Sequence, residues 1–404
     1  MKGYQISQYD MPLCRNGWLE VEANGKKKRI GITRVHLEED VAKMVHRTSA
    51  EGEASSLVDV NRSGVPLMEV VSEPDICSPE EAREYLNRLR TIVQYLGIST
   101  GNMEEGSFRC DANISVRPAG TKEFLPKTEV KNMNSFRAVY RALGFEAERQ
   151  VKVIENGERL IQETRGWVEE KGITVTQRSK EYAHDYRYFP EPDLPPLVCS
   201  KSWVDSIRAR LPELPEARRE RFMTDLGLTA YDAGLLTAEK PTADYFEECV
   251  TAISRNSDED ITRGIAKKAA NWISGDFSRM LNTAGIGIRE SQVTPWNLVE
   301  LLVLVDRGDL SGPSAKAVFE EMFNTGKPAG KIVAEKGLVQ IGDSSQIREA
   351  VLRALATNQA AVDDYHAGKE QALQFLTGQV MKLTRGRANP QMVREILIRE
   401  LGGK

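Results

Sequence analysis

The 404-residue sequence is poor in the features that mark disulfide-linked or membrane proteins. Its five cysteines are scattered and never spaced C-x-x-C, so we expect neither a disulfide framework nor a complete cysteine-based zinc site. No apolar run approaches the roughly 18 residues that a membrane-spanning helix needs. These absences predict a cytoplasmic protein that does not enter a membrane.

Two further absences concern nucleic acids and nucleotides. The net charge of -4 gives no general attraction to nucleic acid, so any such binding must come from a local basic patch. The sequence has no G-x-x-x-x-G-K-[ST] motif, which excludes a P-loop. Gly285-Ile-Gly287 is too short a match to indicate a dinucleotide site.

The residues that are present favour an α+β protein of several domains, because 404 residues exceed a typical single core. Residues 1–210 are predicted to form a β-rich domain with a few helices. Residues 211–328 show repeated helical spacing and predict an all-α domain, and residues 329–404 predict a small α-helical tail domain. Within the first domain, residues 41–56 are small and polar, which favours a loop.

Two local signals predict where elements of the first domain begin and end. Asn24-Gly25 separates two strand-like segments and predicts a hairpin turn, because both residues tolerate positive φ. Ser78 followed by Pro79 predicts the start of an amphipathic helix, with Ser78 as its N-cap.

The stretch Asn61–Asp75 contains an apolar run, Val65–Val71, in which Glu69 is the one charged residue. The β-branched content and the short length predict a strand. Burying an unpaired carboxylate in such a strand costs on the order of several kcal/mol, because the charge loses its hydration. Glu69 therefore either has a cationic partner, which could be Arg, Lys or a metal ion, or faces water at a strand edge. The spacing alone leaves both open.

Phe108–Arg117 alternates between apolar and polar residues, which predicts a strand with one face in a core and an entirely polar opposite face. Such a face is by default solvated. Two neighbouring features weigh against that interpretation. Carboxylates precede the strand at Glu104 and Glu105, and an equally polar strand follows from Lys127.

Carboxylates and cations thus come from several neighbouring predicted strands. The carboxylates are Glu38, Glu39, Glu69, Glu105 and Asp111, and the cations are Arg34, Arg109, Lys127 and Lys131. Carboxylate oxygens suit Mg²⁺, which usually shares its coordination with substrate phosphates, while Arg and Lys bind phosphate directly. The set indicates phosphoryl transfer from a nucleotide, although spacing does not separate it from a surface salt-bridge network.

Five segments resemble the B subunit of the tRNA-dependent amidotransferases, and the resemblance runs from Tyr4 to the C-terminus. They are ITRVHLEED, SLVDVNRSGVPLMEVVSEPD, MEEGSFRCDANISVRP, EVKNMNSF and HDYRYFPEPDLPPL. That family converts Glu-tRNA(Gln) and Asp-tRNA(Asn) to their Gln and Asn forms. The resemblance implies a cradle-shaped catalytic domain in residues 1–210, ATP and Mg²⁺ as cofactors, and work with a glutaminase (A) subunit and a small bridging (C) subunit. The implied activity is that of an ATP-dependent carbon–nitrogen ligase.

The resemblance also implies roles for single residues. It places Glu39 and Glu69 at the metal. To these we add two further candidate catalytic residues, Arg109 and Asp111. Candidate nucleotide-binding residues are Arg34, Glu105, Lys127 and Lys131.

Members of the family normally carry a further N-terminal stretch with a Gly-Leu-Glu-Val-His motif, whose Glu and His belong to the same metal site. Many also carry a zinc-binding set of cysteines there. The present sequence opens at the segment that follows both, so we expect no zinc site. Two explanations of the missing stretch are open: the start of the sequence was assigned too far downstream, or the protein is truly truncated. The alternative to an active subunit is accordingly an inactive tRNA-binding scaffold of the same complex.

The tail is basic although the whole chain is acidic. From Lys369 to Lys404 there are seven Lys and Arg residues against three Glu. Charge count alone leaves a solvated helix face and a phosphate-binding surface equally open. The segment GKEQALQFLTGQVMKLTRGRANPQMV resembles the family tail, which contacts tRNA. The resemblance therefore favours tRNA binding, with Lys382, Arg385 and Arg387 as expected contacts.

Exchanging Arg385→Glu together with Arg387→Glu is expected to weaken the binding of tRNA whatever its sequence. The slope of log affinity against log salt concentration should fall by about one for each phosphate that the variant no longer touches. A salt titration of tRNA binding measures both quantities. Unchanged affinity and slope would show that these two arginines do not contact tRNA.

Overall fold

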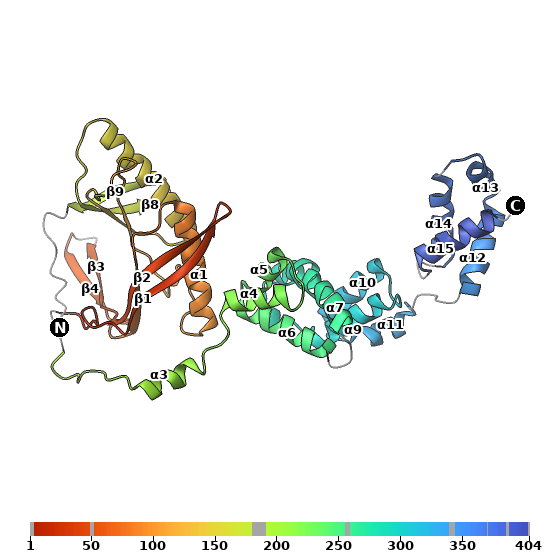
Figure 1. The fold of residues 1–404 in the computed structure, drawn as a ribbon, viewed down its shortest axis with the longest axis horizontal. Helices are drawn as coiled ribbons and strands as arrows, with labels where there is room; N and C mark the ends of the chain where they lie inside the picture. The colour runs from red at the N-terminus through yellow and green to blue at the C-terminus, as the bar shows by residue number, and fades with distance from the viewer. Residues whose placement is uncertain are drawn as a thin grey trace. The chain divides into compact units, whose positions relative to one another are not determined.

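The computed structural model describes residues 4–48, 52–179, 191–254, 259–338, 344–369, 371–384 and 388–402. The chain forms two compact units, Met1–Pro212 and Glu213–Lys404 (Figure 1). The first unit holds the strands and the second is helical in the parts described, so the predicted α+β class is confirmed. No helix within the described ranges is both long enough and apolar enough to cross a membrane.

The first unit contains three sheets and three helices within its described residues. The strands are β1 (Cys14–Ala23), β2 (Lys26–Glu39), β3 (Lys43–Thr48), β4 (Ala54–Asp59), β5 (Pro66–Ser72), β6 (Ala112–Ile114), β7 (Thr128–Lys131), β8 (Glu163–Val168) and β9 (Ile173–Ser179). The helices are α1 (Pro79–Tyr95), α2 (Phe136–Glu155) and α3 (Lys201–Arg208). The sheet orders are β1-β2-β5, β3-β4 and β6-β7-β8-β9, with β7 and β8 parallel and the other pairs antiparallel.

The two predicted local signals are confirmed. Asn24 and Gly25 have φ of 52° and 72° and join β1 to β2, as a two-residue hairpin requires. Ser78 caps α1, because its side chain accepts a hydrogen bond from the backbone N–H of Glu81. The strand predicted around Glu69 is β5, at the edge of its sheet.

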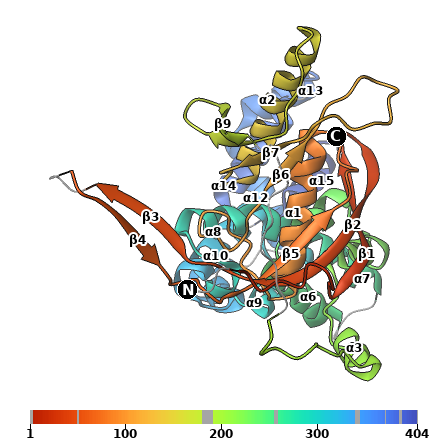
Figure 2. The same ribbon diagram turned by 90° about the vertical axis from the view of Figure 1, so that its left-hand side faces the viewer.

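Two predictions about strands need correction. Residues 41–56 do not form a simple loop, because β3 and β4 pair as a ribbon that reaches away from the rest of the unit (Figure 2). Nearly all of its residues are exposed, so neither face had to be apolar and no alternation marked the strands. The strand predicted over Phe108–Arg117 is shortened to β6, Ala112–Ile114.

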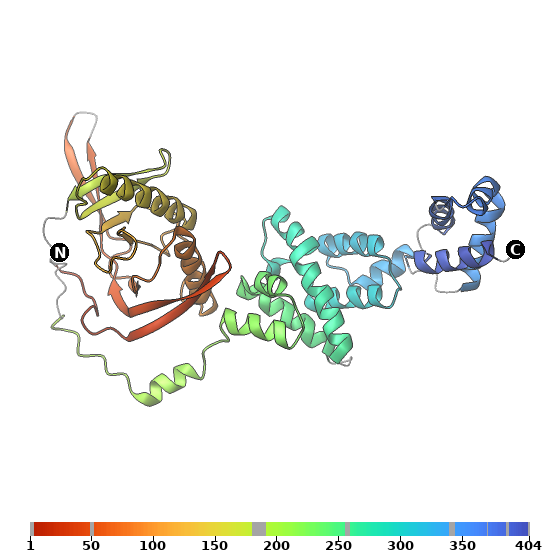
Figure 3. The same ribbon diagram turned by 45° about the horizontal axis from the view of Figure 1, so that its top comes forward.

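One hydrophobic core joins the β1-β2-β5 sheet to the β6–β9 sheet through α1 and α2. Helix α1 lies along the β1–β2 hairpin (Figures 1 and 3), and α2 packs against both α1 and the β6–β9 sheet. Alternating strand residues and one stripe of each helix supply the core. Its buried members include Leu19, Val21, Ile30, Tyr85, Leu86, Val130, Val139, Ala142 and Trp167.

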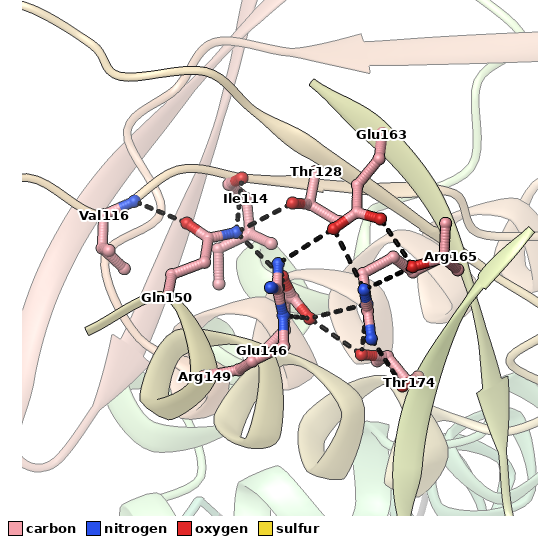
Figure 4. A network of polar contacts seen from close by, with 10 residues as sticks. Ile114, Val116, Thr128, Glu146, Arg149, Gln150, Glu163, Arg165 and Thr174 are labelled. Carbon is pink, nitrogen blue, oxygen red and sulfur yellow. Dashed lines mark hydrogen bonds and ion pairs between the residues drawn. The ribbon is translucent and has the colours of Figure 1, made fainter. Parts of the chain in front are cut away.

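A buried polar network fixes α2 on the β6–β9 sheet (Figure 4). Glu146 of α2 is fully buried, and its carboxylate accepts hydrogen bonds from Arg149, Gln150 and Thr174. Glu163 of β8 is equally enclosed and accepts from Arg149 and Arg165. Two carboxylates thus meet two guanidinium groups, and each charge has a hydrogen-bonded partner.

Gln150 extends this network to the strands that precede it. Its Nε2 donates to Thr128 Oγ1 at 3.1 Å and to the carbonyl of Ile114 at 3.3 Å, and its Oε1 accepts from the N–H of Val116 at 3.0 Å. Burial raises the pKa of Glu146, but hydrogen bonds from Arg149, Gln150 and Thr174 outweigh it, so that pKa lies below its usual 4.5. The carboxylate therefore stays charged where it holds the sheet.

The second unit contains only helices in the residues that are described. They are α4 (Pro215–Thr224), α5 (Ala230–Thr237), α6 (Lys240–Ser254), α7 (Glu259–Trp272), the π-helical turn η1 (Ile273–Phe277), α8 (Ser278–Ala284), the 3₁₀ turn η2 (Ile288–Glu290), α9 (Pro295–Asp306), α10 (Gly312–Thr325), α11 (Ala329–Lys336), α12 (Ser344–Thr357), α13 (Gln359–His366), α14 (Gln371–Leu383) and α15 (Pro390–Leu401). One apolar core runs from Phe222 to Val333 and includes α11, and a second runs from Ile347 to Leu401. The division into three domains stays a prediction.

Replacing Glu146 by Ala is expected to destabilise the first unit by about 3–5 kcal/mol, because Arg149 and Arg165 would then share Glu163 alone and one enclosed positive charge would go unmatched. Hydrogen exchange of the α2 amides in the whole chain measures this loss. Glu20→Ala is the matched control, since its ion pair with Lys27 is solvent-exposed and should contribute about 1 kcal/mol or less.

The same contribution depends on pH in a defined direction. The folded-state pKa of Glu146 is depressed, so its stabilisation is present above the usual pKa of 4.5 and is lost as pH falls through the folded value. The Glu146→Ala chain should lose less stability on acidification than the wild type. An equal loss in both chains would contradict this assignment.

Candidate functional site

The register of β2 against β5 decides which side chains share a face. It shifts between Ile32 and Arg34, and beyond the shift His36 stands opposite Glu69. Because side chains alternate along a strand, Arg34, His36 and Glu38 lie on the face of Glu69. A β-bulge of this kind redirects the side chains that follow it.

His36, Glu38 and Glu69 bring their polar atoms together on this face. His36 is fully buried, and its Nε2 lies 3.1 Å from Glu38 Oε1 and 3.8 Å from Glu69 Oε2. One ligand atom from each residue lies within 4.8 Å of the others. Ser7 Oγ donates to Glu38 Oε1 at 2.9 Å, which ties the N-terminal segment to the cluster.

The electrostatics of Glu69 connect this cluster to the second sheet. Burial raises the pKa of Glu69, and the Glu38 carboxylate raises it further; His36 and Arg34 lower it, and Asp111 raises it. Asp111 precedes β6, so the Glu69 carboxylate feels charge from both sheets. Like charges so close together favour a bound cation.

The donor set of this face matches the needs of a divalent ion. Two carboxylates suit Mg²⁺, whereas an imidazole is the more usual ligand of transition metals. His36 Nδ1 is buried and has no hydrogen-bond partner among the described residues, while Nε2 faces Glu38. Glu38 and Glu69 therefore fit a Mg²⁺ site in which His36 either orients Glu38 or binds the ion itself.

Arg34 lies beside the same cluster. Its guanidinium carbon stands 4.3 Å from the centroid of the Tyr9 ring, and Tyr9 packs edge-on against His36. Arg34 Nε is buried and has no hydrogen-bond partner within the described part of the chain. The side chain is thus held by packing, and its charge remains directed at the carboxylates of this face.

The second sheet contributes a cation held between two acids. Lys131 Nζ lies 2.6 Å from Asp111 Oδ2 and 3.2 Å from Glu129 Oε1, and Glu129 Oε2 accepts from Thr164 Oγ1 at 2.9 Å. Burial lowers the pKa of Lys131, but the hydrogen bond to Asp111 and the charges of Asp111 and Glu129 outweigh it, so the pKa is raised. Lys131 is therefore a fixed positive charge.

Arg109 is held by a residue that the sequence analysis did not single out. Its Nη2 lies 3.2 Å from Oδ2 of Asp40, a buried carboxylate directly after β2. Arg109 thus joins the end of β2 to the segment that leads to Asp111.

The other predicted residues lie elsewhere. Glu39 is on the opposite face of β2 from Glu69, and its Oε1 accepts from the N–H of Ile6 at 3.1 Å. Glu105 is exposed in the turn that starts at Met103, and Lys127 is exposed just before β7. The metal role of Glu39 and the nucleotide roles of Glu105 and Lys127 stay predictions.

The tail residues are placed only in part. Lys382 is exposed in the last turn of α14. Arg385 and Arg387 lie outside the described residues. Asn389 caps α15, which begins at Pro390, by accepting hydrogen bonds from the N–H groups of Gln391 and Met392.

Sequence reasoning missed His36, Asp40 and Arg62 as members of the site. His36 carried a usable signal, since an i, i+2 spacing puts it on the face of Glu38 in any strand. No sequence signal marked the ion pairs of Asp40 with Arg62 and Arg109, because those residues are far apart in the sequence.

Comparison with known proteins gives two family matches and many relatives. Residues 1–205 match the GatB/GatE catalytic domain and residues 244–401 match the GatB domain. Three relatives are each named as the B subunit of an aspartyl/glutamyl-tRNA(Asn/Gln) amidotransferase. They come from Carboxydothermus hydrogenoformans (54% identical over 396 residues, 98% of this chain and 80% of the relative), Dehalococcoides mccartyi (54% over 404 residues, 99% and 82%) and Caldicellulosiruptor saccharolyticus (53% over 403 residues, 99% and 81%).

Replacing Asp111 by Asn is expected to lower the pKa of Lys131, because the charge that offsets its burial would be removed. An NMR titration of the lysine side chains in the whole chain measures this shift. An unchanged Lys131 would show that Asp111 does not hold it in solution.

Proposed function

The chain belongs to the family of aspartyl/glutamyl-tRNA(Asn/Gln) amidotransferase B subunits, and from this membership we propose that its first unit activates the side-chain carboxylate of a misacylated tRNA with ATP. A B subunit implies partner subunits and tRNA. The partners that we propose are a glutaminase (A) subunit, which supplies ammonia, and a small bridging (C) subunit. The tail would bind tRNA through Lys382, Arg385 and Arg387.

The proposed reaction has two balanced steps. A side-chain carboxylate oxygen of Glu-tRNA(Gln) or Asp-tRNA(Asn) attacks the γ-phosphorus of ATP, the bond to the β-phosphate oxygen breaks, and ADP leaves. Ammonia then attacks the carbonyl carbon of the acyl phosphate, phosphate leaves with the bonding electrons, and the nitrogen gives up one proton, which the departing phosphate or water takes. The first step is needed because a carboxylate oxygen is a poor leaving group until it carries phosphate.

The convergence of Glu38, Glu69 and His36 on one face carries this proposal. Glu69 together with Glu38, or with Glu39 as the sequence predicts, would hold Mg²⁺. Bound Mg²⁺ would offset the charge of the phosphates that it contacts. His36, which is buried beside Glu38, would keep that carboxylate in place.

The cations near this face would bind and neutralise phosphate oxygens. Lys131 supplies a point charge that Asp111 holds in position, and Arg34 supplies a planar guanidinium group. Arg109 is proposed to stabilise charge on the transferred phosphoryl group. Because phosphoryl transfer depends mainly on positioning and charge neutralisation, none of these residues has to act as a nucleophile.

The direct test is release of phosphate from ATP in the reconstituted complex with Glu-tRNA(Gln). Glu69→Gln is expected to lower the tRNA-dependent rate by at least the roughly 10–100-fold that loss of an outer-shell partner of a metal site causes, because Glu69 would contact the ion itself. Equal rates for the two chains would exclude a metal role for Glu69. A wild-type complex that binds tRNA without releasing phosphate would instead indicate a scaffold subunit.

Glu38→Gln and Glu39→Gln form a matched pair, because the two residues are adjacent but lie on opposite faces of β2. Binding of Mn²⁺, followed by electron paramagnetic resonance in the absence of nucleotide, reports the ligands separately from turnover. Since Glu38 lies with Glu69, Glu38→Gln should weaken Mn²⁺ binding more than Glu39→Gln. The reverse order would support the ligand predicted from the sequence.

A further inference from the structure

Asp40 gathers two arginines from distant parts of the chain. Its buried Oδ2 accepts from Arg62 Nε at 2.9 Å and from Arg109 Nη2 at 3.2 Å, while Oδ1 accepts from the N–H of Val41 at 2.9 Å. Arg62 precedes β5 and Arg109 precedes β6, so three segments meet at one carboxylate. The carboxylate fixes both guanidinium groups in place.

Arg62 has a second anchor that shapes its surroundings. Its Nη2 donates to the carbonyl of Gly106 at 3.0 Å. Gly106 has φ of +68°, and a Cβ added there would lie 2.8 Å from Arg62 Nη1. The glycine therefore both forms the turn and leaves room for the guanidinium group to lie against the backbone.

The charges at this place do not balance. Two guanidinium groups share one carboxylate, which leaves an excess of one positive charge. By contrast, Arg218 and Arg221 of the second unit meet three carboxylates, Asp244, Glu247 and Glu213. A pair of arginines with excess charge, held rigidly, is what bidentate recognition of an anion requires.

Both arginines remain accessible to a ligand. Their side chains are 41% exposed for Arg62 and 58% for Arg109. Among the described residues, no hydrogen bond uses Arg62 Nη1 or Arg109 Nε. Each guanidinium group therefore keeps a donor that Asp40 does not engage.

The pair lies next to the carboxylates of the proposed metal site. Asp40 is two residues beyond Glu38, and its backbone N–H donates to the carbonyl of Val65 at 2.8 Å, beside the start of β5. Arg109 is two residues before Asp111, whose charge reaches Glu69. A ligand that contacts both a divalent ion at these carboxylates and the two arginines needs several phosphate groups linked in a chain.

We propose that Arg62 and Arg109, held together by Asp40, form a subsite for the polyphosphate chain of a nucleotide. This assignment rests on the proposed function, because it takes the neighbouring carboxylates to hold the ion that the same nucleotide shares. It adds Arg62 and Asp40 to the site and gives Arg109 a defined partner. A phosphodiester of RNA has the same chemistry, so the test includes it.

The test measures binding rather than turnover, with the full 404-residue chain. Calorimetric titrations use Mg-ATP and inorganic tripolyphosphate as probes, and a parallel titration of the same chains uses tRNA. Arg62→Gln and Arg109→Gln should each weaken both probes by about tenfold, which is the usual loss for a hydrogen bond to a charged group. Arg141→Gln is the matched control, because Arg141 is 40% exposed and also pairs with a carboxylate, Glu169. It should leave both affinities unchanged.

Arg62→Lys is a conservative variant that keeps the test valid if Arg62→Gln fails to fold. It keeps the charge but loses the guanidinium fork, so it should bind both probes more weakly than wild type and more tightly than Arg62→Gln. Thermal unfolding of each variant identifies any loss of the fold.

Four results would distinguish the possibilities. If Arg62→Gln and Arg109→Gln bind Mg-ATP and tripolyphosphate as tightly as the wild type does, the subsite is overturned. Weaker tRNA binding with unchanged ATP and tripolyphosphate binding would assign the arginines to RNA and overturn the nucleotide. Failure of the wild type to bind either probe would overturn both the subsite and the proposed function. Arginine-dependent ATP binding without tRNA-dependent phosphate release would leave the subsite standing and the proposed reaction wrong.

Discussion

The pairing of β2 with β5 is the constraint on which the site depends. The register shift after Ile32 puts His36 opposite Glu69 and sets Glu38 on the same face. A strand counted in strict alternation from the buried Ile30 would have directed His36 toward the core. The bulge thus converts one strand from a core-forming element into one that presents charged groups on its other face. The remaining charged residues are positioned relative to this face.

Buried carboxylates have two different uses in the first unit. Glu146 and Glu163 are matched by Arg149 and Arg165, and this balanced network joins α2 to the sheet. Asp40 is shared by two arginines and leaves positive charge exposed to solvent. The balanced arrangement is suited to fixing structure, because no charge remains for a ligand, whereas the unbalanced one is suited to binding an anion.

The sequence predicted the elements whose signals are local. The Asn24-Gly25 turn, the Ser78 cap and the β5 strand are set by residues within a few positions of each other. Sequence reasoning missed the β3–β4 ribbon because its strands are exposed on both faces and so show no alternation of apolar and polar residues. Strand β6 is shorter than its alternation suggested, because alternating burial can persist where ladder hydrogen bonds do not form.

By itself the sequence determined the α+β class, the chemical kinds of residue available to a site, and the resemblance that led to the family. Only the tertiary structure decided which of two adjacent glutamates, Glu38 or Glu39, stands beside Glu69, and which acid holds Arg109. The reason is physical: a one-residue shift in strand register exchanges the faces of a strand, and ion pairs between distant segments depend on that register. Neither the strand register nor these ion pairs can be recognised from the spacing of residues along the chain.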